Sequence, residues 1–201
     1  PNANETKLLE LSATHVRNYW PCVAPHAWQW DGVWFEWMSP DASVLAANGW
    51  PSPAVRLRNA QSCVLRVSNA HGVLWLMGDV GKAQEAAIAQ RLAAREPKVT
   101  GLMGRDPVVV LVAGHHGSAT SSSEAWLRFV RPDWVVAQAG YANPYGHPSA
   151  EVVQRLQRLA PLWRMQWRDT AHCGAALWRS ADAQHLHCER EAWPKHWQHR
   201  P

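Results

Sequence analysis

The apolar run Val108–Ala113 constrains the fold more than any other part of this sequence. Its six residues include no polar side chain, whereas a strand with one face in water alternates polar and apolar residues. The run therefore predicts a strand that is buried on both faces of a sheet. Gly114-His115-His116-Gly117-Ser118 follows directly, which predicts a sharp turn carrying two imidazoles at the end of this strand.

Helices are predicted on both sides of this run. Helical spacing of apolar residues indicates three of them: Lys82–Arg95, a helix from Ser121 to Val130, and Ala150–Leu159. Ser121 and Glu124 have the spacing of a capping box, so we expect Ser121 to cap the second helix. Ser149 is the expected cap of the third helix.

Further strands alternate with these helices. Besides the buried run, strands are predicted at Val33–Met38, Cys63–Ser68, Val73–Met77, Val135–Ala139, Leu162–Trp167, Ala175–Arg179 and Gln184–Cys188. We expect irregular structure over 1–31 and a loop over 39–53. Strand–helix alternation with added hairpins predicts a layered α/β fold, and the 201 residues fit one domain over 1–201.

Composition sets limits on the partners. No apolar run approaches the 18 residues of a membrane span, so we expect no direct membrane insertion. The net charge is +4 and arginine supplies most of the basic residues, which permits contact with nucleic acid but also fits ordinary surface solvation. Among the fourteen tryptophans, Trp30 and Trp34 stand beside Phe35 in a strand pattern, which favours core packing over a stacking platform for bases.

Polar residues follow three of the predicted strands. Asp79, the pair His115 and His116, and His147 each lie just past a strand end. In an open α/β sheet ligands gather at that edge, where imidazole and carboxylate groups can converge on one or two metal ions. A lone Gly-Asp or His-Pro is more often an ordinary turn, so the combination carries the hypothesis.

The order of these motifs resembles a known domain. The motifs are Trp28-Gln-Trp-Asp-Gly32, Asn59-x-x-Ser62, Ser62-Cys-Val-Leu-Arg66, Leu76-Met-Gly-Asp79, His115-His-Gly-Ser118, Ser121-Ser-Ser123, Arg131-Pro132, Gln138-Ala-Gly-Tyr141 and Asn143-Pro-Tyr-Gly-His-Pro148. Over roughly residues 20–180 the chain resembles the C-terminal metallo-β-lactamase-like domain of ComEC-family DNA internalisation (competence) proteins.

The resemblance implies an αββα sandwich and a metal-dependent nuclease of the DNA-uptake channel that degrades the non-imported strand. It implies catalytic roles for Asp79, His115, His116 and Ser118, metal ligation by Asp79, His115 and His147, and substrate binding by Asn59, Ser62 and Asn143.

The cofactor would be a divalent metal, zinc or manganese. The partners would be single-stranded DNA and the membrane channel portion of the same polypeptide. A catalytically silent domain that guides DNA or braces the channel, and a stand-alone hydrolase of small esters, are the alternatives.

One motif of the resembled family is missing. The family carries an early His-x-x-x-Asp-His-type motif that supplies ligands of the first metal, and His26 has the wrong spacing for it. We expect that motif upstream of Pro1, so the fold would be incomplete at its N-terminal half. The fragment would then bind metal poorly and be inactive.

Four cysteines form no Cys-x-x-Cys pair, so a structural zinc knuckle is not expected. Four free thiols in a cytosolic domain are one interpretation. If 175–179 and 184–188 pair about a turn near Ser180, opposed residue numbers sum to about 361, which places Cys173 opposite Cys188. This predicts a Cys173–Cys188 disulfide, and Cys22–Cys63 follows by elimination. Both agree with the resemblance, which implies a periplasmic-facing domain of an inner-membrane protein.

Overall fold

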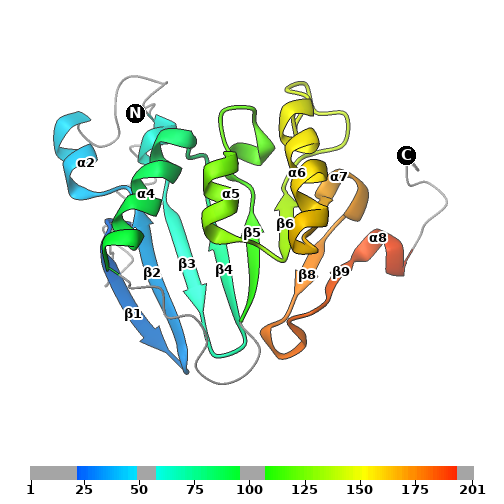
Figure 1. Ribbon diagram of the computed structural model, residues 1–201, viewed down its shortest axis with the longest axis horizontal. Helices are drawn as coiled ribbons and strands as arrows, with labels where there is room; N and C mark the ends of the chain where they lie inside the picture. The colour runs from blue at the N-terminus through cyan, green and yellow to red at the C-terminus, as the bar shows by residue number, and fades with distance from the viewer. Residues whose placement is uncertain (1–21, 49–57, 96–106, 194–201) are drawn as a thin grey trace, which may run out of the picture.

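The computed structural model describes residues 22–48, 58–95 and 107–193. Within these residues seven strands form one mixed sheet (Figure 1), in the spatial order β1 (His26–Trp30), β2 (Val33–Ser39), β3 (Val64–Ser68), β4 (Gly72–Leu76), β5 (Val108–Val112), β6 (Trp134–Ala137) and β7 (Gln166–Asp169). The first four strands form an antiparallel meander, and β4 to β7 run parallel. Parallel strands place their carboxyl ends at one edge, which is where the polar loops leave the sheet.

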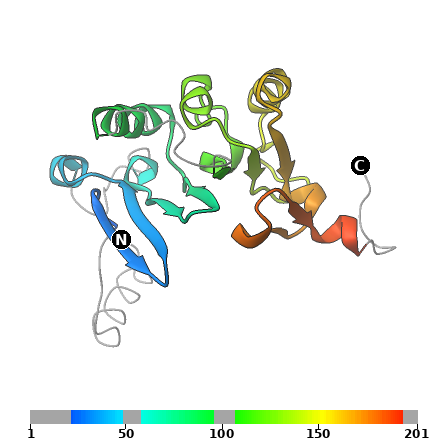
Figure 2. The same cartoon turned by 60° about the horizontal axis from the view of Figure 1, so that its bottom comes forward.

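The sheet is covered differently on its two faces, as Figures 1 and 2 show. One face packs against α4 (Lys82–Arg95), α5 (Glu124–Val130) and α6 (Ala150–Trp163). Part of the other face packs against a two-stranded hairpin, β8 (Ala176–Trp178) and β9 (Leu186–Cys188). The remaining short elements are α2 (Ala42–Asn48), α7 (Thr170–Cys173), α8 (Glu189–Ala192) and the 3-10 turns η1 (Asn59–Gln61), η2 (Gly114–Gly117) and η3 (Ser180–Asp182).

Two apolar clusters hold these layers together. The larger one lies under the helices, where Trp75 of β4 meets Trp126 of α5 edge to face at 5.2 Å. The smaller one joins Val110 and Trp134 to Trp178 under the β8–β9 hairpin. Leu111 of β5 is completely buried on the helix side, while Val110 is buried on the hairpin side. The prediction that this strand is buried on both faces is confirmed, and so is the mixed α/β class.

Two predictions for the first fifty residues are wrong. Residues 1–31 were expected to be irregular, but His26–Trp30 forms β1 and pairs with β2 across the turn at Asp31. The predicted loop over 39–53 contains α2. The side chain of Asp41 accepts a hydrogen bond from the backbone of Val44 at 3.0 Å and starts this helix, a cap that the Pro- and Ser-rich composition obscured.

Two helix boundaries also differ from the predictions. Ser123, rather than Ser121, caps α5 by accepting a hydrogen bond from the backbone of Trp126. Ser121 is instead buried, and its hydroxyl donates to the backbone carbonyls of Gly114 and Ser118. The predicted strand over 162–167 is shorter, because α6 continues through Pro161 and β7 begins only at Gln166. Ser149 caps α6 as predicted.

The tryptophans at the start of the sheet are less buried than predicted. Trp30 is 74% exposed and Trp34 is 51% exposed, so neither packs in the core. They lie near the turn of the β1–β2 hairpin, at the edge of the sheet where the parallel strand β4 begins, and Trp34 is opposite Ser68. Trp28 and Phe35 are only partly buried and stack on each other across the two strands at 5.2 Å. Aromatic packing here stabilises a hairpin rather than filling the core.

Both predicted disulfides are present, Cys22–Cys63 and Cys173–Cys188. The register used to predict the second was wrong, since Ala176 is opposite Cys188 and opposed numbers in β8 and β9 sum to 364. Cys173 lies at the end of α7, just before the hairpin, and its Cα is 4.7 Å from that of Cys188. The bond therefore links a helical turn to a strand instead of two facing strands.

Candidate functional site

The loops that follow β4, β5 and β6 carry Asp79, the pair His115 and His116, and His147. They meet at the carboxyl edge of the parallel strands, and close backbone contacts hold them together. The backbone of His115 donates to the Gly78 carbonyl at 2.8 Å, and that of Ser149 donates to the Gly117 carbonyl at 2.9 Å. A Cβ added at Gly114 would lie 2.9 Å from the Val80 carbonyl oxygen, and one at Gly117 would lie 2.8 Å from Pro148. These positions admit only glycine without a shift of the neighbouring loop.

The two histidines of the central loop have left-handed backbone conformations. The φ angles are 46° at His115 and 58° at His116, and a non-glycine residue adopts this region at an energetic cost. The turn directs the two rings differently, with their centres 6.3 Å apart at an angle of 58°. The strain is thus associated with presenting two imidazoles from adjacent positions.

His116, in the loop after β5, contacts both neighbouring loops, the one after β4 and the one after β6. Its Nδ1 lies 2.8 Å from the carbonyl oxygen of Gln138, which can only accept, so Nδ1 carries a proton. Its Nε2 faces Oδ1 of Asp79 at 3.4 Å. A neutral His116 would therefore point a lone pair at a carboxylate, and a proton or a cation between the two atoms would satisfy both.

His115 has partners on both ring nitrogens. The side-chain amide of Asn59 donates to Nε2 at 3.4 Å, and Nδ1 lies 3.3 Å from the hydroxyl of Thr120. That hydroxyl is in turn 3.0 Å from the hydroxyl of Ser118, which is buried. Ser118 therefore reaches the site through Thr120, and the network favours the His115 tautomer with the proton on Nδ1.

His147 completes the group of imidazoles. Its ring centre is 5.8 Å from that of His115, in an edge-on arrangement. Asn143 fixes the backbone here, since its side-chain oxygen accepts from His147 N at 2.9 Å and its amide donates to the His147 carbonyl at 2.6 Å. Nδ1 of His147 is buried and has no hydrogen-bond partner among the described residues. Burial lowers the pKa of His147, and His115 and His116 lower it further, which favours a neutral imidazole able to act as a ligand.

The structure thus brings together the residues that the sequence selected. Direct contacts link Asp79 to His116, His115 to Asn59 and His147, and His147 to Asn143. Ser62 lies beside the same loops, because a Cβ added at Gly78 would be 3.3 Å from its Cβ. Sequence reasoning missed Thr120 and the Gln138 carbonyl. Thr120 stands close to the histidine motif and could have been selected, whereas a backbone carbonyl leaves no residue signal.

Glu85 of α4 anchors the segment that follows the histidine loop, and it was also missed. Its carboxylate is 1% exposed and accepts from the backbone N–H groups of Ser122 and Ser123 at 2.5 and 2.9 Å. Burial raises the pKa of Glu85, while hydrogen bonds from Ser123 and Ser122 and the charge of Arg155 oppose that shift. Glu85 therefore holds the chain between the site and α5.

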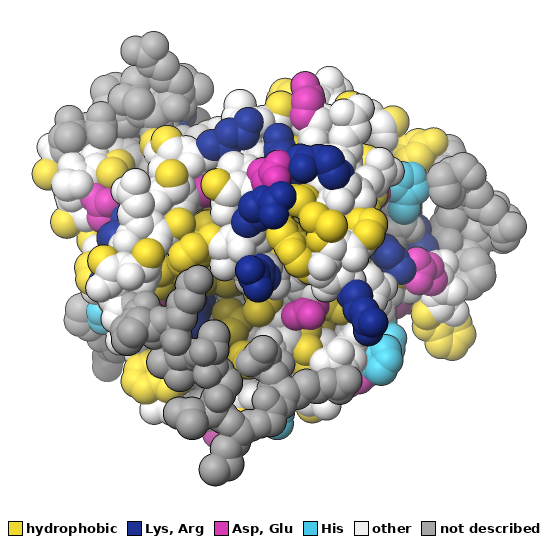
Figure 3. All heavy atoms as spheres, viewed as in Figure 1, with side chains coloured by type: hydrophobic (Ala, Val, Ile, Leu, Met, Phe, Trp, Pro, Cys, Tyr) yellow, Lys and Arg dark blue, Asp and Glu magenta, His cyan; other side chains and the backbone are white. Residues whose placement is uncertain are grey.

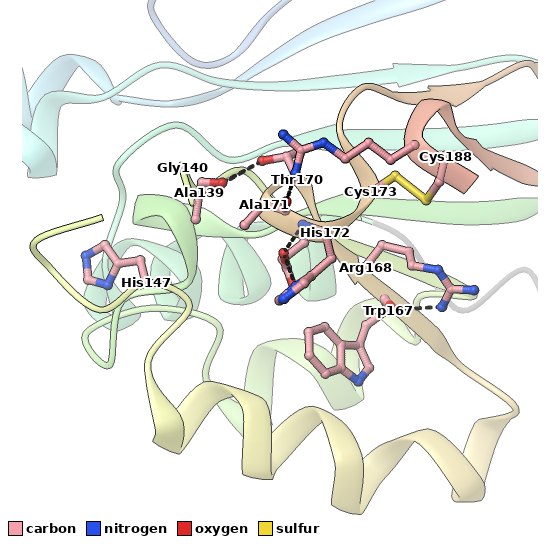
Figure 4. A network of polar contacts seen from close by, with 12 residues as sticks. Ala139, Gly140, His147, Trp167, Arg168, Thr170, Ala171, His172, Cys173 and Cys188 are labelled. Carbon is pink, nitrogen blue, oxygen red and sulfur yellow. Dashed lines mark hydrogen bonds and ion pairs between the residues drawn. A yellow bond between two sulfur atoms is a disulfide. The ribbon is translucent and has the colours of Figure 1, made fainter. Parts of the chain in front are cut away.

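A second carboxylate–imidazole pair lies at the same edge, at the end of β7 (Figure 4). The carboxylate of Asp169 is nearly buried and lies 2.7 Å from Nδ1 of His172. The hydroxyl of Thr170 connects this turn to the loop that carries His147, through hydrogen bonds with the backbone N–H and carbonyl of Ala139. Asp169 also caps α7, so the pair has a structural role.

Basic side chains gather over the helix layer, as Figure 3 shows for the face seen in Figure 1. Several are engaged in the fold. Arg158 and Arg128 both bond to Glu124, at 2.6 and 2.7 Å, and lower its pKa to about 2. Arg155 donates to the carbonyl of Ser122 at 2.7 Å. The helix face therefore permits phosphate contacts but has no built binding site among these residues.

The donor types at the carboxyl edge fit a zinc or manganese ion, since both accept imidazole and carboxylate ligands. The number of such donors that converge at one point in the described part of the chain is too small for a complete metal site. Among residues 22–48, 58–95 and 107–193, no group of three or more His, Cys, Asp or Glu side chains is arranged to hold a metal ion. The described residues can therefore supply only part of a coordination sphere.

Part of the sequence is similar to parts of larger curated proteins. No family model matches the sequence. The chain is 36% identical over 134 residues to Competence protein ComA of Neisseria gonorrhoeae, and 33% identical over 137 residues to Recombination protein 2 of Haemophilus influenzae. It is 31% identical over 125 residues to ComE operon protein 3 of Bacillus subtilis. These matches cover 67, 68 and 62% of this chain but only 16, 14 and 13% of the three relatives.

Proposed function

We propose that this chain, which is related in sequence to competence proteins, belongs to a DNA-uptake protein of natural transformation. In this proposal it is the C-terminal metallo-β-lactamase-like domain of a ComEC-family protein, and the sheet β1 to β7 is one of the two sheets of an αββα sandwich. The similarity to Competence protein ComA supports the process, and the small share of each relative that is matched supports a domain of a larger protein.

The activity that the site supports best is metal-dependent hydrolysis of phosphodiesters in the non-imported DNA strand. One observation carries this proposal: Nε2 of His116 faces the Asp79 carboxylate at 3.4 Å while Nδ1 is committed to a carbonyl. Two ligands at about 2.1 Å from one tetrahedral ion lie about 3.4 Å apart, so the pair has the spacing of two ligands of a single metal.

The proposed roles follow from the contacts of each residue. Asp79 and His116 would supply two ligands to a zinc or manganese ion, with His115 and His147 beside them as candidate ligands of a second ion, and the remaining donors would have to come from elsewhere in the natural protein. Bound metal supplies an acidified water and electrostatic stabilisation of the phosphoryl group. Asn59 holds the ring of His115, Asn143 holds the backbone of His147, and Ser118 acts on His115 through Thr120. Ser62, beside Gly78, would contact substrate at the rim.

The proposed location is the periplasmic face of the inner membrane, with the channel portion of the same polypeptide as partner. Two disulfides support this, because disulfides persist in oxidising compartments. None of the helices described in the structure has the length and apolarity needed to cross a bilayer.

A catalytically silent domain that guides DNA or braces the channel is the second candidate. The observation in its favour is that the described residues provide no complete metal-binding group. The two candidates differ in chemistry but share the DNA partner, so cleavage separates them.

The test is cleavage of a labelled single-stranded oligonucleotide by the natural protein that contains this chain, with Mn²⁺ or Zn²⁺ and with EDTA. We expect metal-dependent cleavage that Asp79→Ala reduces by about 100-fold or more, because loss of a ligand should cost at least as much as the roughly 10- to 100-fold lost with an outer-shell partner. Asp182→Ala is the matched control, because Asp182 also contacts two imidazoles, His185 and His187, on the β8–β9 hairpin. Equal loss in both variants, or no metal-dependent cleavage, would favour the silent domain.

A further inference from the structure

Tyr145 is an exposed aromatic side chain beside the candidate site that no step above uses. It is 80% exposed, the largest exposure among the large apolar and aromatic side chains in the described part of the chain. Its ring lies over that of His147, with centres 5.9 Å apart and planes inclined by 21°. An aromatic surface this open has no role in the core, which directs attention to what could stack on it.

The loop that carries Tyr145 is held in one shape. Asn143 bonds to the carbonyls of Gly140 and His147 and to the backbone N–H of His147, and Gly146 N donates to the Asn143 carbonyl at 3.1 Å. Because both ends of the loop are tied to one side chain, the backbone that carries Tyr145 is fixed beside His147. Preorganisation of this kind reduces the entropy lost when a ligand binds.

The space beside this loop is open. A Cβ added at Gly140 or at Gly146 would meet no heavy atom within 4 Å apart from neighbouring residues of the chain. Because Tyr145 is 80% exposed and His147 lies on one side of its ring, the other side is accessible to a flat ligand. Three ring centres then follow one another from solvent into the site, Tyr145 to His147 at 5.9 Å and His147 to His115 at 5.8 Å.

We propose that Tyr145 is the stacking platform for an unpaired nucleobase whose phosphate is directed toward the imidazole group at the carboxyl edge. This inference rests on the proposed function and names the form of its substrate. Every base has a π face that can stack on a tyrosine, so the platform accepts single strands of any sequence. A base inside a duplex is already stacked and paired on its edges, so the platform discriminates against duplex DNA.

The test measures binding without cleavage. Fluorescence anisotropy of labelled oligothymidylate is recorded with the 201-residue chain in EDTA at low salt, alongside an abasic oligonucleotide of the same length and a duplex. Tyr145→Ala should weaken binding of oligothymidylate by about 5-fold or more, the loss expected for one base–aromatic stack. Tyr145→Phe keeps the ring and should stay within about 2-fold. Neither variant should change binding of the abasic strand.

Trp30→Ala is the matched control, because Trp30 is also an exposed aromatic residue but lies at the opposite edge of the sheet. It should bind all three oligonucleotides as the unaltered chain does. The platform proposal is wrong if Tyr145→Ala binds oligothymidylate as tightly as the unaltered chain does. It is also wrong if the substitution weakens binding of the abasic strand by the same factor. A 2-aminopurine in the strand should lose fluorescence on binding to the chain and keep it with Tyr145→Ala.

The two proposals fail separately. Adding Mn²⁺ or Zn²⁺ to the natural protein tests hydrolysis, whereas the EDTA measurement tests only stacking. Base-dependent binding through Tyr145 without cleavage would refute the nuclease and leave the platform intact. Metal-dependent cleavage that Tyr145→Ala leaves unchanged, together with unchanged binding, would refute the platform alone.

Discussion

At the scale of single residues, the site depends on groups that satisfy buried backbone polar atoms. Glu85 is the clearest example, because its two carboxylate oxygens accept the N–H groups of Ser122 and Ser123 inside the protein. Its raised pKa shows that burial opposes the ionised form, while the hydrogen bonds to these N–H groups partly offset that effect. The same residue thus connects α4 to the segment that follows His115 and His116.

Replacing Glu85 should destabilise the fold. Glu85→Ala leaves the buried N–H of Ser122 and the partly buried N–H of Ser123 without acceptors. A fully buried donor left unpaired costs about 1–3 kcal/mol and a partly buried one costs less, so the free energy of unfolding should fall by about 2–4 kcal/mol. Urea unfolding measures this. Glu151→Ala is the control, since Glu151 is an exposed glutamate in the first turn of α6 and should change stability by less than about 0.5 kcal/mol. A loss below 1 kcal/mol in Glu85→Ala would show that the carboxylate does not hold the segment.

The pH dependence provides a second check on Glu85. Because its pKa is raised in the folded state, the folded chain binds more protons than the unfolded chain between the ordinary value of 4.5 and the raised value. The stability that Glu85 contributes is therefore largest at or below pH 4.5 and decreases as the pH rises through the raised pKa. The difference in unfolding free energy between the unaltered chain and Glu85→Ala should shrink over that interval; a difference that grows would contradict the assignment.

At the scale of elements, the β8–β9 hairpin is short and depends on its connections. Each strand has three residues, and the hairpin covers Val110 and Trp134 through Trp178 and Leu186. The Cys173–Cys188 bond joins β9 to α7, while the side-chain amide of Asn69 donates to the Ser180 hydroxyl at the other end. We therefore expect the hairpin to be the part most sensitive to loss of a crosslink.

Removal of this disulfide should lower stability measurably. The two cysteines are 15 residues apart, and closing a loop of this length contributes about 3 kcal/mol in the chain-entropy model. Cys173→Ala with Cys188→Ala should reduce the free energy of unfolding by that order and raise hydrogen exchange in β8 and β9. Cys22→Ala with Cys63→Ala removes the disulfide that links cysteines 41 residues apart, for which the same model gives about 4 kcal/mol of stability. This double variant should leave hydrogen exchange in β9 unchanged. Equal exchange in both variants would indicate that the hairpin does not depend on its bond.

Elements with strong local patterns were predictable from the sequence, and those fixed by tertiary contacts were not. The helix Lys82–Arg95 and the strand from Val108 match because periodicity and continuous apolarity determine them. β1 was missed because its alternation of Ala and Gln with His and Trp becomes a strand only through pairing with β2. The Cys173–Cys188 disulfide was predicted correctly, but from a strand register that is wrong. The bond forms because α7 brings Cys173 back toward β9.

At the scale of the whole molecule, the sheet has one covered face and one that is covered in part. The rule that ligands gather at the carboxyl ends of parallel strands predicted where Asp79, His115, His116 and His147 meet. It could not predict which ring nitrogen carries a proton, since that depends on partners such as the Gln138 carbonyl. The position of Tyr145 is likewise a product of the loop that Asn143 closes.

The face of β1 to β4 away from the helices carries apolar side chains in register. Trp28, Phe35, Val67 and Leu74 are opposite one another across four strands, as are Trp37, Leu65 and Leu76. Leu76 is 37% exposed, and most of the others are half-buried. The smaller apolar cluster under β8 and β9 includes Leu74, so the hairpin covers this end of the row. The apolar clusters of the described residues include none of Trp28, Phe35 and Val67. A contiguous apolar surface of this kind binds hydrophobic dyes in the folded state.

We expect the folded chain to bind anilinonaphthalene sulfonate on this face, and Leu76→Gln to reduce the fluorescence. Glutamine is neutral, so the substitution changes apolarity without altering the attraction between an anionic dye and a protein of charge +4. Leu162→Gln is the matched control, because Leu162 is 62% exposed but lies on α6, on the other side of the sheet. Dye also binds loosely packed states, so both variants must keep one cooperative urea transition for the comparison to hold. If the two substitutions reduce the fluorescence equally, the dye reports general exposure and the apolar face of β1 to β4 is not a distinct surface.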